Sequence, residues 1–158
     1  MSRPPRFEVV PAPDTLRRKA LVAEGTMEEA LHEAVARAEA ALAELAPEFD
    51  AWMSREAERL AAAHRAWRAA PDRASRGALF RAAHSLRGQA GGFGYPLAGR
   101  ICAGLARLAA GDGPLPPGLV DAHVEAVRAV VREGARRADD PLGSALAAEL
   151  ERLAAEVG

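Results

Sequence analysis

Residues 82–97, AAHSLRGQAGGFGYPL, place a nucleophile, a cation and several glycines within an alanine-rich helical sequence. His84 offers an imidazole, which at neutral pH often has a free nitrogen lone pair. Arg87 follows three residues later, and its guanidinium is well shaped for phosphoryl oxygens. Each glycine inside a helix costs about 1 kcal/mol of stability relative to alanine, so these glycines are expected to serve a purpose other than helix stability. The glycines are Gly88, Gly91, Gly92 and Gly94.

Helix geometry predicts the direction in which His84 points. The inner stripe of this helix consists of apolar residues, namely Leu79, Ala83, Leu86, Ala90 and Phe93. At about 100° per residue, His84 lies roughly 140° from the mean direction of that stripe and is expected to face solvent. Gly88 and Gly91 lie about 40° and 20° around the helix from His84. Because glycine has no side chain, the surface beside the histidine is left uncovered at these two positions, so a large partner could approach it closely.

The same stretch resembles the signature of histidine-containing phosphotransfer (HPt) domains over about 25 residues. The matching positions are His84, Leu86, Arg87, Gly88, Ala90, Phe93 and Gly94, followed by Ile101 and Cys102 at the start of the next helix. The resemblance implies that His84 accepts a phosphoryl group and exchanges it with the aspartate of a response-regulator receiver domain. A histidine kinase or hybrid kinase would be the other partner, and the chain would be a carrier without turnover of its own.

The resemblance also implies roles for the neighbours of His84. Arg87 stands where the family usually has lysine and would stabilise the phosphoryl charge. The residues expected to dock the partner are Phe80, Gly88 and Gly91. The residues expected to maintain the structural motif are Leu86, Ala90, Phe93 and Gly94. No cofactor or metal is expected on this chain, because the magnesium for transfer would sit with the carboxylates of the receiver domain. Where the family often supplies a polar partner for the imidazole, this sequence has Ala103 and Ala106.

Amphipathic stretches separated by turn signals predict the elements that must position this site. Thr26 and Glu29 fit a capping box at the start of a first helix, and Pro47 is expected to begin a second. Further helices are expected to open near Asp72 or Ser75, near Pro96, near Leu119 and at Asp140. The predicted fold is all-α: an antiparallel up-down four-helix bundle over residues 21–137, with a partly disordered N-terminal arm (1–20) and a C-terminal helix (138–158). That last helix could pack on the bundle or on a second copy.

Composition excludes several classes of function. The 158 residues carry a net charge of −1 with acids and bases interspersed, so we expect no nucleic-acid or membrane-surface partner. No apolar run reaches the ~18 residues of a membrane span, and we expect a cytoplasmic protein. Cys102 is the single cysteine and is expected to be a small buried hydrophobe.

The remaining chemistry-bearing residues favour structural roles. His64 and His123 fall on or near apolar stripes, and Trp52 and Trp67 are expected to pack between helices. Glu29 and His32 have the spacing of a di-iron ligand pair, but such a site needs two pairs and only one is present. Two alternatives to the phosphorelay intermediate stay open: a non-phosphorylated helical adaptor that binds a kinase or response regulator through the same face, and a metal-binding bundle enzyme.

Overall fold

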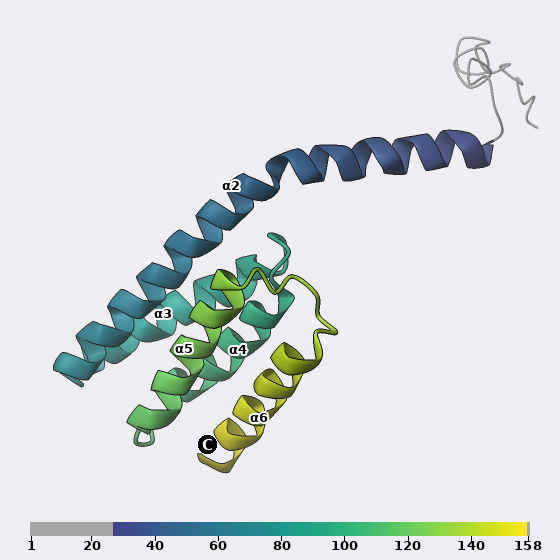
Figure 1. Cartoon of the computed structure of the whole chain (residues 1–158). Coiled ribbons are helices and arrows are strands. Elements are labelled where there is room, and N and C mark those ends of the chain that lie inside the picture. Colours follow the sequence, from purple (N-terminus) through teal and green to yellow (C-terminus); the bar gives the residue numbers. More distant parts are fainter. Residues whose placement is uncertain (1–26, 158) are drawn as a thin grey trace, which may run out of the picture. The chain divides into compact units, whose positions relative to one another are not determined.

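The computed structural model describes residues 27–157, and all regular structure in them is helical (Figure 1). The helices are α2 (Met27–Ala69), α3 (Arg73–Ala90), α4 (Pro96–Ala110), α5 (Pro117–Arg132) and α6 (Pro141–Val157). The prediction of an all-α bundle is confirmed. The expected arm (1–20) and Thr26 lie outside the described residues. The chain divides into two units, one that ends at Glu44 and one that begins at Leu45.

The predicted break at Pro47 is wrong, because α2 runs through this proline as one helix. The fixed φ of proline is compatible with a helix, but the missing N–H and the crowding of its ring against the carbonyl group four residues earlier cost about 3 kcal/mol, which other contacts must offset. In the next turn of α2, Asp50 accepts hydrogen bonds from the Tyr95 hydroxyl and from the Arg136 guanidinium. Arg136 also donates to the Ala46 carbonyl oxygen at 3.4 Å. These contacts hold the helix on both sides of the proline.

The core lies among the second half of α2 and helices α3, α4 and α5. Its largest fully buried side chains are Tyr95, Met53, Leu60, Leu79, Leu86, Leu97, Ile101, Leu105, His123, Val120, Val124 and Val127. Helix α4 is the central element, with ten buried residues among its fifteen. Gly99 allows α4 to approach α3 closely, because an added Cβ there would lie 3.4 Å from the carbonyl oxygen of Arg87. This close packing fixes the helix that carries His84.

Helix α6 packs on α4 and α5 of its own chain, the first of the two arrangements left open by the sequence. Asp140 caps it by accepting a hydrogen bond from the Gly143 amide at 2.7 Å, as predicted. Gly143 fits tightly against α4, since an added Cβ would lie 2.6 Å from Cδ1 of Leu97. One helical face buries Ala147, Leu150 and Ala154, and Arg100 makes a two-pronged ion pair with Glu151, each contact being 2.7 Å.

Candidate functional site

The start of α3, the helix that carries His84, is fixed by local capping. The Asp72 carboxylate accepts a hydrogen bond from the Ser75 amide at 2.7 Å, and Ser75 Oγ accepts one from the Asp72 amide at 3.1 Å. This capping box places the start at Asp72, the first of the two predicted positions. The hydrogen bond from the Ser75 amide also lowers the pKa of Asp72, because it stabilises the carboxylate.

The end of α3 is fixed by a glycine turn. The Tyr95 amide donates to the Ala90 carbonyl oxygen at 2.8 Å and the Gly94 amide to that of Gly91 at 3.1 Å. This pattern needs a left-handed residue, and Gly94 supplies it with φ +79°. Phe93 therefore lies in the turn beyond α3, which corrects its predicted place on the helical stripe.

Phe93 nevertheless anchors this turn to the body of the bundle. Its ring stacks on Trp52 with centroids 4.3 Å apart, and it meets Phe49 edge-on at 5.1 Å. Both partners lie on α2. The predicted packing role of Trp52 is confirmed by this contact, and that of Trp67 by its burial.

His84 is exposed, while Leu86 two residues later is fully buried, as helix geometry predicts. Within residues 27–157, neither ring nitrogen of His84 has a hydrogen-bond partner. Phe80, one turn earlier, lies beside it with ring centroids 5.5 Å apart and planes at 39°. The imidazole is therefore supported by an aromatic neighbour and has free access to solvent.

Glycines clear the surface beside His84 in the C-terminal direction of α3. An added Cβ at Gly88 or Gly91 would meet nothing within 4 Å. Gly77, seven residues before His84 and about 20° around the helix, is not open in the same way, because an added Cβ there would lie 3.3 Å from Nη1 of Arg81.

Charge is not interspersed around this site, which corrects the sequence-based expectation. Residues 73–110 contain six arginines and no carboxylate, whereas the rest of the chain has 15 basic and 22 acidic residues. Arg81 and Arg87 stand three residues before and after His84, and neither forms an ion pair with a described residue. The face around His84 is therefore positive and suited to an anionic group or an acidic partner.

Helix α4 supplies no polar group to orient the imidazole. Ala106 is buried, and Ala103 is half-buried. The resemblance to HPt domains implies a polar partner at these positions, where this sequence has alanines, and no residue among 27–157 forms a hydrogen bond with the His84 ring. The ring orientation therefore depends on Phe80 and on the helix itself.

The other histidines and the cysteine have structural surroundings. His64 Nε2 lies 2.6 Å from Asp121 Oδ1, and His32 Nδ1 lies 2.9 Å from a backbone carbonyl oxygen of the preceding turn. His123 is fully buried, and burial lowers its pKa. Cys102 is buried as predicted, and burial raises its pKa to about 12. No group of three or more potential metal ligands occurs between residues 27 and 157.

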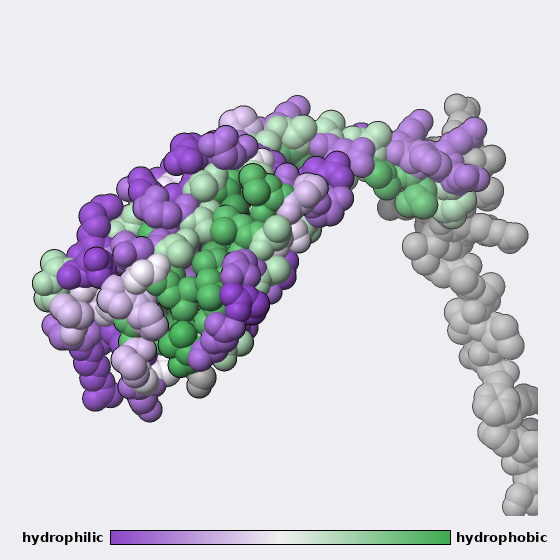
Figure 2. Space-filling view, turned by 60° about the horizontal axis from the view of Figure 1, so that its bottom comes forward, coloured by the Kyte–Doolittle hydropathy of each residue, from purple (hydrophilic) through white to green (hydrophobic). Residues whose placement is uncertain are grey.

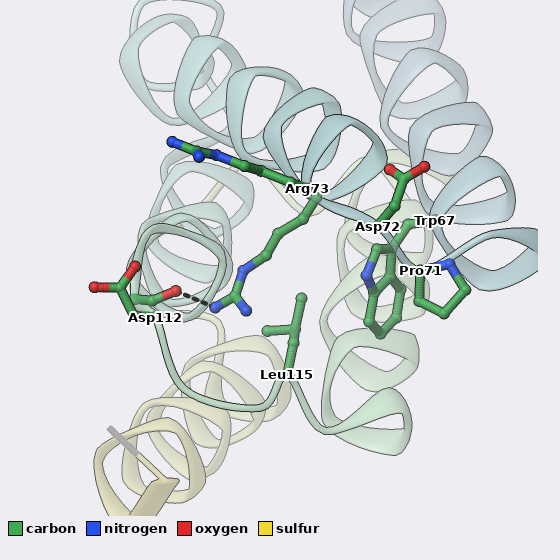
Figure 3. A pocket seen from close by; sticks show the side chains of 8 residues that line it. Trp67, Pro71, Asp72, Arg73, Asp112 and Leu115 are labelled. Carbon is green, nitrogen blue, oxygen red and sulfur yellow. Dashed lines mark hydrogen bonds between the residues drawn. The ribbon is translucent and has the colours of Figure 1, made fainter.

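A surface hollow of about 570 Å³ lies at the other end of α3, among Trp67, Asp72, Arg73 and Leu115 (Figure 3). Arg76 at its edge donates to carbonyl oxygens at the end of α4 and in the following loop, those of Leu108, Ala109, Gly111 and Gly113. Its donors are thereby occupied in capping α4. Arg76 is the lining residue of α3 that comes nearest to His84 in sequence, eight residues or about 12 Å of helix away, so the hollow belongs to a different part of the surface.

The comparisons with known proteins identify one family. A family model described as "Hpt domain" matches residues 25–156, a span that includes α6 as well as the four preceding helices. No curated protein and no solved structure matches the chain. Among the described helices, none is long and apolar enough to cross a membrane.

Proposed function

Because this chain belongs to the Hpt domain family of two-component phosphorelay proteins, we propose that His84 is its phosphoacceptor. It would exchange a phosphoryl group with the aspartate of response-regulator receiver domains in the cytoplasm, with a histidine kinase or hybrid kinase upstream. The observation that carries this proposal concerns all four histidines of the chain. His84 alone among them is exposed and free of a hydrogen bond to another described residue.

The chemistry requires little from this chain. The lone pair of a ring nitrogen, in our proposal the outer Nε2, attacks the phosphorus of the receiver's aspartyl phosphate. An N–P bond forms, the P–O bond to the aspartate breaks, and the electron pair leaves with the carboxylate. Transfer from His84 to a receiver is the same step reversed. The magnesium that neutralises charge in this step would be held by the receiver's carboxylates.

The positive face supports both docking and transfer. Arg87 has no ion pair to break, so its guanidinium is available to the phosphoryl oxygens on His84. Arg81 lies on the opposite side of the histidine and adds to the same field. An acidic receiver site would be steered toward such a face, and the association rate would fall as salt is added.

The surroundings of His84 also favour storage of the phosphoryl group. Neither α3 nor α4 contains a carboxylate, so these two helices provide no general base to activate water against phosphohistidine. The phosphoryl group would persist until a receiver aspartate arrives. This property suits a carrier that has no turnover of its own.

The alternative is an adaptor that binds a kinase or receiver through the same face without phosphorylation. The absence of a polar partner for the imidazole at Ala103 and Ala106 favours it. An unoriented ring spends less time in the geometry for in-line attack, and this would slow transfer. Binding of a partner through the glycine-cleared surface would be unaffected.

Transfer of labelled phosphate separates these two functions. The full chain is incubated with phosphorylated receiver domains, or with candidate kinases and labelled ATP. We expect a label that is lost in acid and stable in base, that is absent from His84→Gln and that is retained by His32→Gln, the matched variant of the other exposed histidine. Label on His84→Gln would refute the assignment. A wild-type chain that binds receivers but takes no label would establish the adaptor.

A further inference from the structure

The first part of α2 carries an apolar seam that residues 27–157 leave uncovered. We define the seam as Leu31, Val35, Ala38, Leu42 and Leu45. The exposed fractions of Leu31, Val35 and Leu42 are 62%, 48% and 58%. In Figure 2 this part of α2, next to the grey atoms, has hydrophobic residues on one side and hydrophilic residues on another. Exposed apolar rows of this kind mark interaction surfaces.

The spacing of the seam indicates what covers it. Its residues follow one another at intervals of four, three, four and three, which is the heptad pattern of a coiled coil. Such a pattern makes a narrow row, about 21 Å long at 1.5 Å per residue, that fits one other helix lying alongside. A matching seam is needed on that helix, and a second copy of this chain supplies one.

The flanks of the seam allow two identical copies to meet. Small residues, Ala34 and Ala41, border one side, and His32 and Glu39 border the other. If the helices run parallel, Ala34 faces the other copy's Glu39; if they run antiparallel, His32 faces Glu39 and the alanines face each other. Neither arrangement opposes like charges at these positions.

The acidic residues of this segment lie mostly away from the seam. At about 100° per residue, Glu29, Glu33 and Glu44 fall roughly 160° to 220° around the helix from Leu31. Arg37, at about 240°, lies beside them and approaches Glu33 to 3.9 Å. The charge that keeps this helix in solution is therefore on the face opposite the seam, and it does not prevent two seams from pairing.

We propose that two copies of this chain associate through the seam of α2 as a two-helix coiled coil. The association would place two phosphotransfer bundles in one particle without using any residue of α3. A seam of about two heptads is short, and an isolated helix of such length is marginal in water. The dimer is therefore expected to be reversible and to depend on concentration.

Sedimentation equilibrium of the full chain from about 1 to about 100 μM, the range in which a weak dimer dissociates, tests this proposal. We expect the mass to rise from 16.6 kDa toward twice that value. The variant Val35→Glu/Leu42→Glu should stay monomeric throughout. Its matched control, Ala36→Glu/Ala40→Glu, adds the same charge on the far side of the helix and should dimerise like the wild type.

Two results would overturn the proposal. One is a wild-type chain that remains monomeric at the highest concentration. If the seam variant then also has a lower Tm than the wild type, the chain covers the seam with its own residues. The other is a seam variant that dimerises as well as the wild type. Transfer of label to His84 in the seam variant would verify that its bundle is folded. If the wild type takes no label, that result contradicts the proposed phosphotransfer function and leaves the proposed dimer untouched.

Discussion

Replacing Gly88 with alanine should make the protein more stable, although natural helices rarely place glycine where alanine fits. The added Cβ would meet nothing within 4 Å, so no packing cost offsets the gain in helix propensity. That gain is about 0.5–1 kcal/mol. For a domain of this size it corresponds to a rise in Tm of about 2–5 °C, measured by thermal unfolding followed by circular dichroism. A fall in Tm would show that Gly88 has a structural role and would remove our account of it.

The benefit of Gly88 should appear when the partner docks. Gly88→Leu places a large side chain about 40° around the helix from His84, on the cleared surface. Overpacking of this kind costs about 1–3 kcal/mol, so binding of a receiver domain should weaken about 5- to 150-fold in titration calorimetry. The matched control is Gln89→Leu, an exposed position of the same helix about 140° from His84, which should bind normally. Equal affinities for the two variants would refute a docking role for the cleared surface.

Three further predictions concern the core and the charged face. Gly104→Ala should destabilise the protein by up to about 2 kcal/mol in chemical denaturation, because its Cβ would lie 2.9 Å from the buried Nε2 of His123 and overpacking outweighs helix propensity. Burial lowers the pKa of His123, so the unfolded chain binds the proton more readily than the folded one and stability should fall as pH drops below about 6.5, by at most about 1.4 kcal/mol per pH unit. His123→Leu should remove that slope between pH 5 and 6.5, and an unchanged slope would assign it to another group. Arg87→Glu should weaken receiver binding about tenfold at low salt while Arg87→Lys preserves it; equal losses would mean that shape rather than charge matters at this position.

Local signals in the sequence placed the start of α3 to within a turn, whereas the helical stripe extended its end too far, to Phe93. Asp72 caps its start through its own side chain, and Gly94 ends the following turn because it adopts a positive φ. Both depend on residues that are neighbours in the chain, and such chemistry can be predicted without the rest of the fold. The same holds for Asp140 at the start of α6.

Pro47 could not be interpreted in this way. Proline at the first turn of a helix and proline inside a helix have the same φ, so the sequence pattern does not distinguish two helices from one. The groups that hold the chain here, Tyr95 and Arg136, are 45 and 86 residues away from their partner Asp50. Only the folded chain brings them together.

The exposure of His84 followed from the helical period, but the charge around it did not follow from the composition. A net charge of −1 averages over the whole chain and conceals a segment, residues 73–110, that contains arginines and no acid. Once the structure places Arg81 and Arg87 on the helix of His84, the segment becomes a surface.

The central claim is that His84 carries the phosphoryl group, and site-resolved detection of phosphohistidine tests it most directly. The full chain is phosphorylated by a charged receiver or kinase, digested at neutral pH and analysed by tandem mass spectrometry. We predict phosphate on the peptide that contains His84 and none on the peptides with His32, His64 or His123. Phosphate on another histidine, with His84 unmodified, would contradict the account.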